Sequence, residues 1–279
     1  MRIDPSITHG GIALDTHGFT YVVKSSSLLP EECDSEIAVR TKYIPEVEQI
    51  IRETTGAKKA IVVNVTFRNR KPLSGENKSQ DTSIRDESYK NLLQFSGPMV
   101  AGTPSSMEPA RYLHCDYTLH GMMQLIAHGE QAFAEAGAEA LAAYNSRAPD
   151  SVNGSQPRVA AYSVWRPLKT VKRDPLVVAA WKSISPNDMV KATYQAKGKD
   201  GNYTMESWAL RPSDDASKHQ WYWLPEQKPE EALIFKFSDT ASVSDEDVAA
   251  WTAHGSPQVL GTEDEEARES VEARVLAFW

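Results

Sequence analysis

The sequence predicts a mainly β protein, a sandwich or barrel of short strands with helices packed on the outside. The second half of the chain alternates apolar segments, rich in β-branched and aromatic residues, with turn residues. Long stretches of helical periodicity occur in two segments of the first half. No linker long enough to divide the 279 residues is present, so one domain spanning 1–279 is expected.

The first half contains two predicted strands, at 18–23 and 59–67. Apolar residues at helical spacing predict a helix over 45–55, with Gly56 at its C-cap. The Ala-rich segment 124–144 has the same periodicity and predicts one helix or a helical pair. The polar segment 68–90 has no period, and it is interpreted either as a solvated loop or as a mobile lid.

Seven further strands are predicted in the second half, at 158–166, 176–184, 189–195, 203–210, 219–224, 232–237 and 270–278. The glycine-rich segment Lys197–Asn202 predicts a tight hairpin between two of them. Strands at this spacing, with no visible repeat, favour a closed or double-layered β architecture.

Charge and cysteine usage exclude several classes of protein. The 38 acidic residues outnumber the 30 basic ones, and the net charge of −8 disfavours a duplex nucleic acid or an anionic membrane as a partner. The two cysteines, Cys33 and Cys115, indicate no disulfide framework. The N-terminus lacks the apolar core of a signal peptide and no run is long enough to span a bilayer. We therefore expect a cytoplasmic monomer or homodimer that acts on a small molecule.

The segment that carries chemistry is His114-Cys115-Asp116. Residues two apart in a strand point to the same side, so one imidazole and one carboxylate can face a single ion. Two histidines and one carboxylate on one face leave positions open for substrates, as in non-heme iron enzymes. His-x-Asp alone is common by chance, so a third ligand is required. His254, after a short helical segment predicted at 243–250, is the best candidate.

Two arginines near the C-terminus compete for an anionic co-substrate. Arg268 and Arg274 share strand parity, but six residues of extended chain separate them by about 20 Å, so both cannot grip one small diacid. Arg268, in the Arg268-Glu269-Ser270 motif, is favoured by its spacing from His254. Arg274 would otherwise be an ion-pair residue of the last strand. His-x-Asp, a distant His and then Arg-x-Ser is the order found in iron(II)- and 2-oxoglutarate-dependent oxygenases.

Several segments carry a closer resemblance: 164–168 (VWRPL), 174–176 (DPL), 219–222 (HQWY), 232–239 (ALIFKFSD) and 268–274 (RESVEAR). From about Tyr43 onward the chain resembles the fungal family of gibberellin-desaturase-like and cephalosporin-methoxylase-like oxidoreductases. The resemblance implies a double-stranded β-helix, the cupin-like jelly roll. It also implies Fe(II) held by His114, Asp116 and His254, with 2-oxoglutarate and O2 as co-substrates. Arg268 with Ser270, or Arg274, would bind the 2-oxoglutarate.

The chain departs from the family pattern beside the site. Relatives tend to carry Pro-His-Thr-Ala-Phe where this chain has Ala253-His254-Gly255-Ser256-Pro257, and Ser163 replaces the usual Asn. These changes alter the pocket and therefore bear on the substrate. Arg166, Trp165 and Tyr222 are candidates for binding it. Arg166 has an alternative role, anchoring a loop through backbone carbonyls, and the aromatic residues have one in the core.

The leading functional hypothesis is an oxygenase of secondary metabolism. It would oxidise an unactivated C–H bond of a natural product or an amino acid, by hydroxylation, desaturation or ring closure such as C–N bond formation. An alternative keeps the fold and the metal but needs no co-substrate, which would give a metal-dependent isomerase or cyclase. A third possibility is a binding protein with a decayed site, which the retained ligands disfavour.

Overall fold

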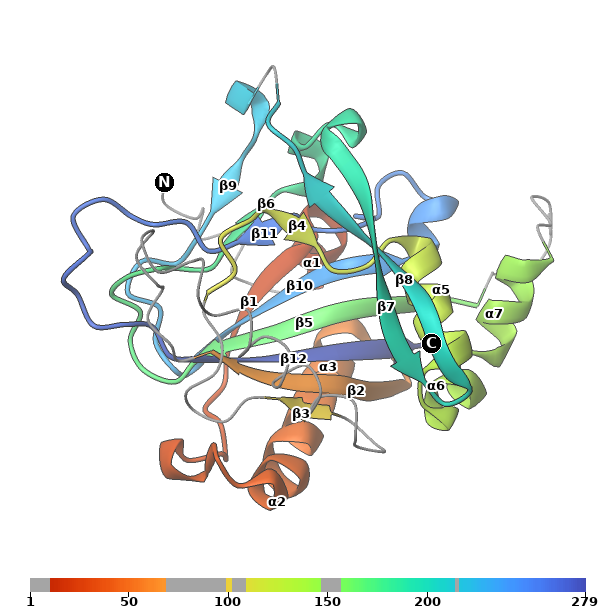
Figure 1. Ribbon diagram of the computed structural model, residues 1–279, viewed down its shortest axis with the longest axis horizontal. Coiled ribbons are helices and arrows are strands. Elements are labelled where there is room, and N and C mark those ends of the chain that lie inside the picture. The colour runs from red at the N-terminus through yellow and green to blue at the C-terminus, as the bar shows by residue number, and fades with distance from the viewer. Residues whose placement is uncertain (1–10, 69–98, 102–108, 147–156, 214–215) are drawn as a thin grey trace.

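The computed structural model describes residues 11–68, 99–101, 109–146, 157–213 and 216–279, which form two six-stranded sheets facing one another (Figure 1). The first sheet has the order β1-β10-β5-β12-β2-β3. Its strands are β1 (Phe19–Val23), β10 (Glu231–Asp239), β5 (Val159–Pro167), β12 (Ser270–Phe278), β2 (Lys59–Arg68) and β3 (Met99–Ala101). Neighbours pair antiparallel except β2 and β3, which are parallel.

The second sheet has the order β7-β8-β4-β11-β6-β9, with antiparallel neighbours throughout. Its strands are β7 (Met189–Gly198), β8 (Gly201–Leu210), β4 (His114–Cys115), β11 (His254–Gly255), β6 (Val177–Ala179) and β9 (Trp221–Tyr222). The two shortest central strands, β4 and β11, lie side by side in the middle of this sheet. Segments far apart in the chain thus meet at its centre.

The main core fills the space between the sheets. Phe235, Trp165 and Leu276 enter it from the first sheet, and Val178 and Met205 from the second. Three helices, α5 (Leu119–His128), α6 (Gln131–Ala136) and α7 (Ala138–Asn145), contribute further side chains at one end of the sheets (Figure 1). Apolar residues on alternate positions of each strand account for this layer.

A second core covers the outer face of the first sheet. Helix α3 (Ile44–Thr55) places Val47 and Ile51 against Tyr162 and Ile234 of that face. The helix ends where Gly56 takes a left-handed conformation, φ 75°, and its N–H donates to the carbonyl of Arg52. Helices α1 (Gly11–His17) and α2 (Glu36–Ala38) lie in the same N-terminal segment. The first sheet therefore separates two apolar layers.

The predicted strands, the 45–55 helix and the hairpin at Lys197–Asn202 are confirmed, and Gly198 pairs with Gly201 at the hairpin tip. The helix predicted at 243–250 is wrong, because a 3-10 helix at Thr240–Val243 is followed by turns. The 124–144 segment contains parts of three helices instead of the expected one or two, because α5 ends at His128 before Gly129 and α6 ends at Ala136 before Gly137.

Two of the predicted strands are shorter than expected. The 176–184 strand is reduced to β6, after which Trp181–Ser183 forms a 3-10 turn, and the 219–224 strand is reduced to β9. The proposed lid at 68–90 lies outside the described residues, apart from Arg68. Among the helices that the structure describes, none has both the length and the apolar character needed to cross a bilayer.

Candidate metal centre and co-substrate site

Two histidines meet across a pair of neighbouring strands. His114 on β4 and His254 on β11 are directly opposite in the antiparallel register, and their ring centroids lie 4.4 Å apart. A Cβ at Gly255 would lie 2.9 Å from the carbonyl oxygen of Tyr112, so glycine permits this close approach of the two strands. The register thus brings together the histidines that the sequence separates widely.

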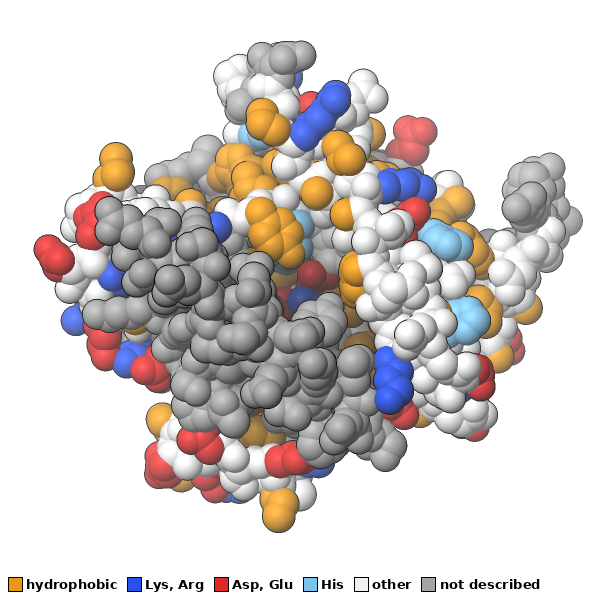
Figure 2. Space-filling view, viewed as in Figure 1, with side chains coloured by type: hydrophobic (Ala, Val, Ile, Leu, Met, Phe, Trp, Pro, Cys, Tyr) orange, Lys and Arg blue, Asp and Glu red, His pale blue; other side chains and the backbone are white. Residues whose placement is uncertain are grey.

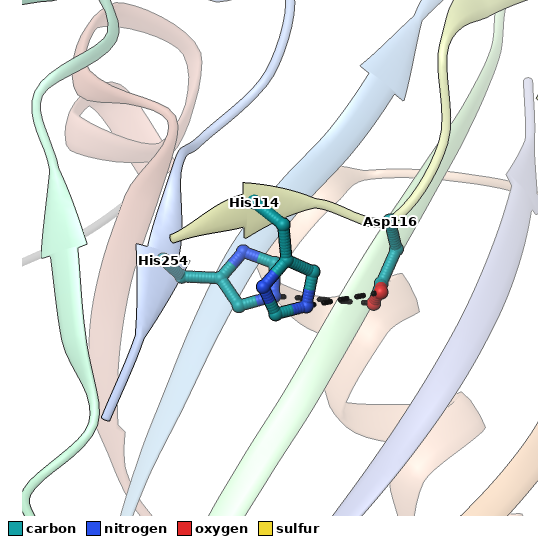
Figure 3. Close-up of side chains that lie close together, drawn as sticks. All are labelled: His114, Asp116 and His254. Atoms are coloured by element: carbon teal, nitrogen blue, oxygen red, sulfur yellow. Dashed lines mark ion pairs between the residues drawn. The ribbon is translucent and has the colours of Figure 1, made fainter. Parts of the chain in front are cut away.

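Asp116, which directly follows β4, completes the cluster (Figure 3). Its Oδ1 lies 3.5 Å from Nε2 of His114, and its Oδ2 lies 4.0 Å from Nε2 of His254. The three ligand atoms all lie within 4.8 Å of one another. Both histidines are buried, and about a tenth of the Asp116 side chain is accessible. The three residues expected to bind a metal are therefore arranged around one point.

Backbone carbonyls fix the orientation of both imidazoles. Nδ1 of His114 lies 3.0 Å from the carbonyl oxygen of Tyr112, and Nδ1 of His254 lies 3.1 Å from that of Thr252. A carbonyl only accepts hydrogen bonds, so each Nδ1 carries the proton and each Nε2 keeps its lone pair. Burial lowers the pKa of His254 to about 4, and His114 adds to this effect. His254 is therefore neutral, as a metal ligand must be.

Arg274 reaches from β12 across to the same carboxylate. Its Nε donates to Oδ2 of Asp116 at 2.8 Å, and its Nη2 donates to Oδ1 at 3.2 Å. Burial alone would raise the pKa of Asp116, but Arg274 and the two imidazoles hold it well below its usual range. This two-point contact fixes the carboxylate plane. It also commits Nε and Nη2 of Arg274, the alternative candidate for 2-oxoglutarate, to Asp116.

Arg268 lies just before β12, with its guanidinium carbon 5.2 Å from the centre of the Trp165 ring. Its Nη1 donates to the carbonyl of Asp174 at 2.8 Å and to Oγ of Ser256 at 3.1 Å. Its Nε is buried and has no partner among the described residues, and the same holds for Oγ of Ser270. Burial lowers the pKa of Arg268 to about 9, and Arg68 adds to the effect. A bound carboxylate would satisfy both groups and compensate the cation.

Arg166 lies on the opposite face of the first sheet. Its neighbours on β5, Tyr162 and Val164, pack in the outer core, whereas Trp165 belongs to the core between the sheets. The Arg166 guanidinium donates to the carbonyls of Lys24 and Pro229. It also pairs with Glu46 at 3.3 Å. Strand alternation turns the Arg166 side chain away from the metal centre, and its contacts suit the alternative role of anchoring a loop. A substrate contact by Arg166 stays a prediction.

The other two residues expected to bind substrate have different surroundings. Trp165 is buried, and its ring lies under the Arg268 guanidinium, so it supports that side chain. Tyr222 is half-buried, its ring lies 5.4 Å from that of Phe19, and its hydroxyl donates to Gln220. A substrate contact by Tyr222 stays a prediction.

Sequence reasoning missed two residues beside the centre. Tyr112 is largely exposed, and its ring lies 4.3 Å from that of His114. Glu272 is a buried carboxylate on β12 that accepts a hydrogen bond from Oγ of Ser163 at 3.0 Å. Strand parity could have found Glu272, because it lies midway between Ser270 and Arg274 on the same face. No sequence signal distinguishes Tyr112 from an ordinary surface tyrosine.

Two imidazole nitrogens and one carboxylate oxygen are the donor set that suits Fe(II) with open positions. The buried, unpartnered Nε of Arg268 and Oγ of Ser270 suit the carboxylate of a diacid. Fe(II) and a dicarboxylate co-substrate therefore both fit the residues present. The fold and the site together define a non-heme iron oxygenase that uses 2-oxo acid co-substrates.

Comparisons with known proteins agree with this class. The family model described as "Oxidoreductase/YMDC permease-like domain" matches residues 4–278. The gibberellin cluster GA4 desaturase of Gibberella fujikuroi is 31% identical over 99% of this chain and 85% of its own length. The alpha-ketoglutarate-dependent dioxygenase tstK of Talaromyces stipitatus is 28% identical over 96% of this chain and 80% of its own.

A solved structure of the iron and alpha-ketoglutarate-dependent endoperoxidase NvfI is 26% identical, with a TM-score of 0.63 over 95% of this chain and 80% of that one. The chain belongs to this fungal family of gibberellin-desaturase-like oxidoreductases. It has their jelly-roll fold and is an Fe(II)- and 2-oxoglutarate-dependent oxygenase of secondary metabolism that acts on a small molecule. The co-substrate-independent isomerase or cyclase is not favoured.

Proposed function

We propose that His114, Asp116 and His254 hold the Fe(II), and that Arg268 with Ser270 holds the distal carboxylate of 2-oxoglutarate. The observation that carries this proposal is the cross-strand pair of histidines, whose Nε2 atoms both face the Asp116 carboxylate. When bound, iron, 2-oxoglutarate and O2 supply the oxidising chemistry for an unactivated C–H bond, with succinate as the co-product.

The protein contributes orientation. The Tyr112 and Thr252 carbonyls hold the two imidazoles in the tautomer that leaves Nε2 for the metal. Arg274 fixes the plane of Asp116. The ring of Trp165 supports Arg268 from below, so its guanidinium is positioned before the co-substrate arrives.

The reaction outcome depends on where the substrate C–H bond lies relative to the metal. The relatives are named as a desaturase, a dioxygenase and an endoperoxidase, so they share an oxidising centre and not one product. Hydroxylation, desaturation and ring closure all begin with removal of a substrate hydrogen. The pocket residues therefore decide which of the three follows.

Anaerobic titration with Fe(II) and 2-oxoglutarate tests the assignment. The wild type should develop the weak visible charge-transfer band of the chelate, and His114→Ala, Asp116→Ala and His254→Ala should each abolish it. His219→Ala is the matched control, because His219 pairs with Asp188 at 3.3 Å outside this cluster. An unchanged band in the three triad variants would rule out the site. Succinate formation measured alongside product separates the oxygenase from a co-substrate-independent enzyme.

We further propose that the chain works as one domain, as a cytoplasmic monomer or homodimer. Both sheets contribute to one continuous core, which supports a single folding unit. Both cysteines are free thiols, which suits a reducing compartment. Size-exclusion chromatography with light scattering measures the oligomeric state, and a single unfolding transition by calorimetry is expected for one domain.

A further inference from the structure

The inner face of the first sheet carries a polar row opposite the metal centre. Arg274 on β12 is in register with Ser163 on β5 and with Asn64 on β2. Glu272, two residues before Arg274, projects from the same face. Figure 2 shows acidic and basic side chains together at the bottom of a hollow, bordered by hydrophobic and histidine side chains. A purely apolar substrate would leave the polar side chains of this row without hydrogen-bond partners.

Glu272 is a buried acid near the metal centre that has no role in the proposed oxidation. Its carboxylate accepts a hydrogen bond from Oγ of Ser163 at 3.0 Å. Among the described residues, the nearest cationic nitrogen is Nη2 of Arg68, which lies 3.9 Å from Oε2 of Glu272 and so beyond hydrogen-bond distance. A carboxylate offers about four acceptor sites. Glu272 therefore has acceptor capacity directed into the space between the sheets.

Asn64 and Arg274 complete a set of complementary groups. Oδ1 of Asn64 is buried and has no partner among the described residues, so it is a second open acceptor in the row. Arg274 uses Nε and Nη2 on Asp116, while a fifth of its side chain is accessible. The guanidinium has five N–H donors, so its Nη1 edge can bind an anion without releasing Asp116.

We propose that the substrate is a small α-amino acid, with its ammonium group on Glu272 and Asn64 and its carboxylate on the open edge of Arg274. Successive inward residues of a strand lie about 7 Å apart, and their long side chains can converge on one compact zwitterion. An uncharged polycyclic substrate would bury these groups without partners, which is costly. This inference rests on the proposed oxygenase function and names its substrate class.

The first test uses each of the twenty proteinogenic amino acids as probes with wild-type protein loaded with Fe(II) and 2-oxoglutarate. At least one should stimulate succinate formation and perturb the visible band. Its amide, which lacks the carboxylate, and its α-hydroxy acid, which lacks the ammonium, should stimulate at least tenfold less. Stimulation by uncharged terpenoids and by no amino acid would overturn the inference, and so would no stimulation by any amino acid.

The second test is Glu272→Gln. It should lower kcat/KM for the stimulating amino acid at least about thirtyfold, since a buried charge partner is lost. The variant should also show a smaller ratio of kcat/KM for the amino acid to kcat/KM for the α-hydroxy acid than the wild type does. Glu48→Gln is the matched control, a half-buried glutamate that accepts a bond from the Val62 N–H on the other face of the sheet. Equal losses in both variants, or an unchanged preference in Glu272→Gln, would assign Glu272 a structural role only.

These outcomes distinguish failure of the proposed metal and co-substrate site from failure of the proposed substrate class. A wild-type protein that forms no Fe(II) and 2-oxoglutarate band contradicts the proposed metal and co-substrate site. A wild type that forms the band but ignores every amino acid contradicts only the substrate class. The Glu272→Gln protein should retain the band without substrate and should bind 2-oxoglutarate within threefold of the wild type.

Discussion

Arg166 on β5 and Arg268 just before β12 are both buried arginines, yet their side chains lie on opposite faces of the first sheet. Arg166 has two carbonyls and the Glu46 carboxylate around its guanidinium. Arg268 has one carbonyl and one hydroxyl, and no carboxylate among the described residues lies within ion-pair distance of it. Nε is buried without a partner among those residues in both arginines, so the difference lies in the paired charge of Arg166. Burial lowers the pKa of Arg268 to about 9.

The difference distinguishes a structural cation from a binding one. A buried arginine whose charge is paired with a carboxylate of the same fold stabilises that fold. A buried arginine whose charge has no carboxylate partner in the fold can bind an anion from solution. The two faces of the first sheet therefore have different roles. The outer face packs against α3 and the loop that Arg166 anchors, and the inner face lies opposite the candidate metal centre.

Arg166→Met should give the largest effect on the folded protein. The substitution leaves Glu46 buried without its cation and two carbonyls without a donor, so the free energy of unfolding should fall by about 3 kcal/mol. Chemical denaturation of the metal-free protein measures this. Unchanged stability would contradict the structural assignment, whereas binding of 2-oxoglutarate should remain within threefold of the wild type.

Arg274→Gln should have a smaller effect, a loss of Fe(II) affinity that grows as the pH falls. Arg274 holds the pKa of Asp116 well below its usual range against the opposing effect of burial, so removing the guanidinium raises that pKa. Protons then compete with Fe(II) for the carboxylate as the pH falls. Relative to pH 7.5, the Fe(II) affinity at pH 5.5 should drop about tenfold further in the variant than in the wild type. Anaerobic competition with a chelator at both pH values measures this, and identical pH profiles would contradict the role given to Arg274.

Much of the fold could be predicted because its signals are local. Alternating apolar residues identified the strands, and Gly56 marked the end of α3. The helix predicted at 243–250 failed because turns and a short 3-10 segment followed Asp239, whose side chain accepts a bond from the Ala241 N–H. Local apolar spacing does not reveal such capping.

The site could be predicted only in part. Motif order identified His114, Asp116 and His254, but their meeting depends on the register of two strands two residues long. Strand parity placed Arg268 and Arg274 on one face, yet only the structure shows that Arg274 reaches Asp116 from there. The sequence did not determine whether Arg166 faces the metal centre, because the length of the β5 segment does not fix which of its faces is turned inward.

The most direct test of this account is calorimetric titration of 2-oxoglutarate into anaerobic Fe(II)-loaded protein, comparing Arg268→Met with Arg166→Met. Loss of Arg268 should weaken binding about a hundredfold, because a charge-assisted pair is lost while the metal chelate remains. Loss of Arg166 should leave the dissociation constant within threefold of the wild type. Wild-type affinity for 2-oxoglutarate in Arg268→Met, or a large loss of affinity confined to Arg166→Met, would contradict the central claim that Arg268 binds the co-substrate.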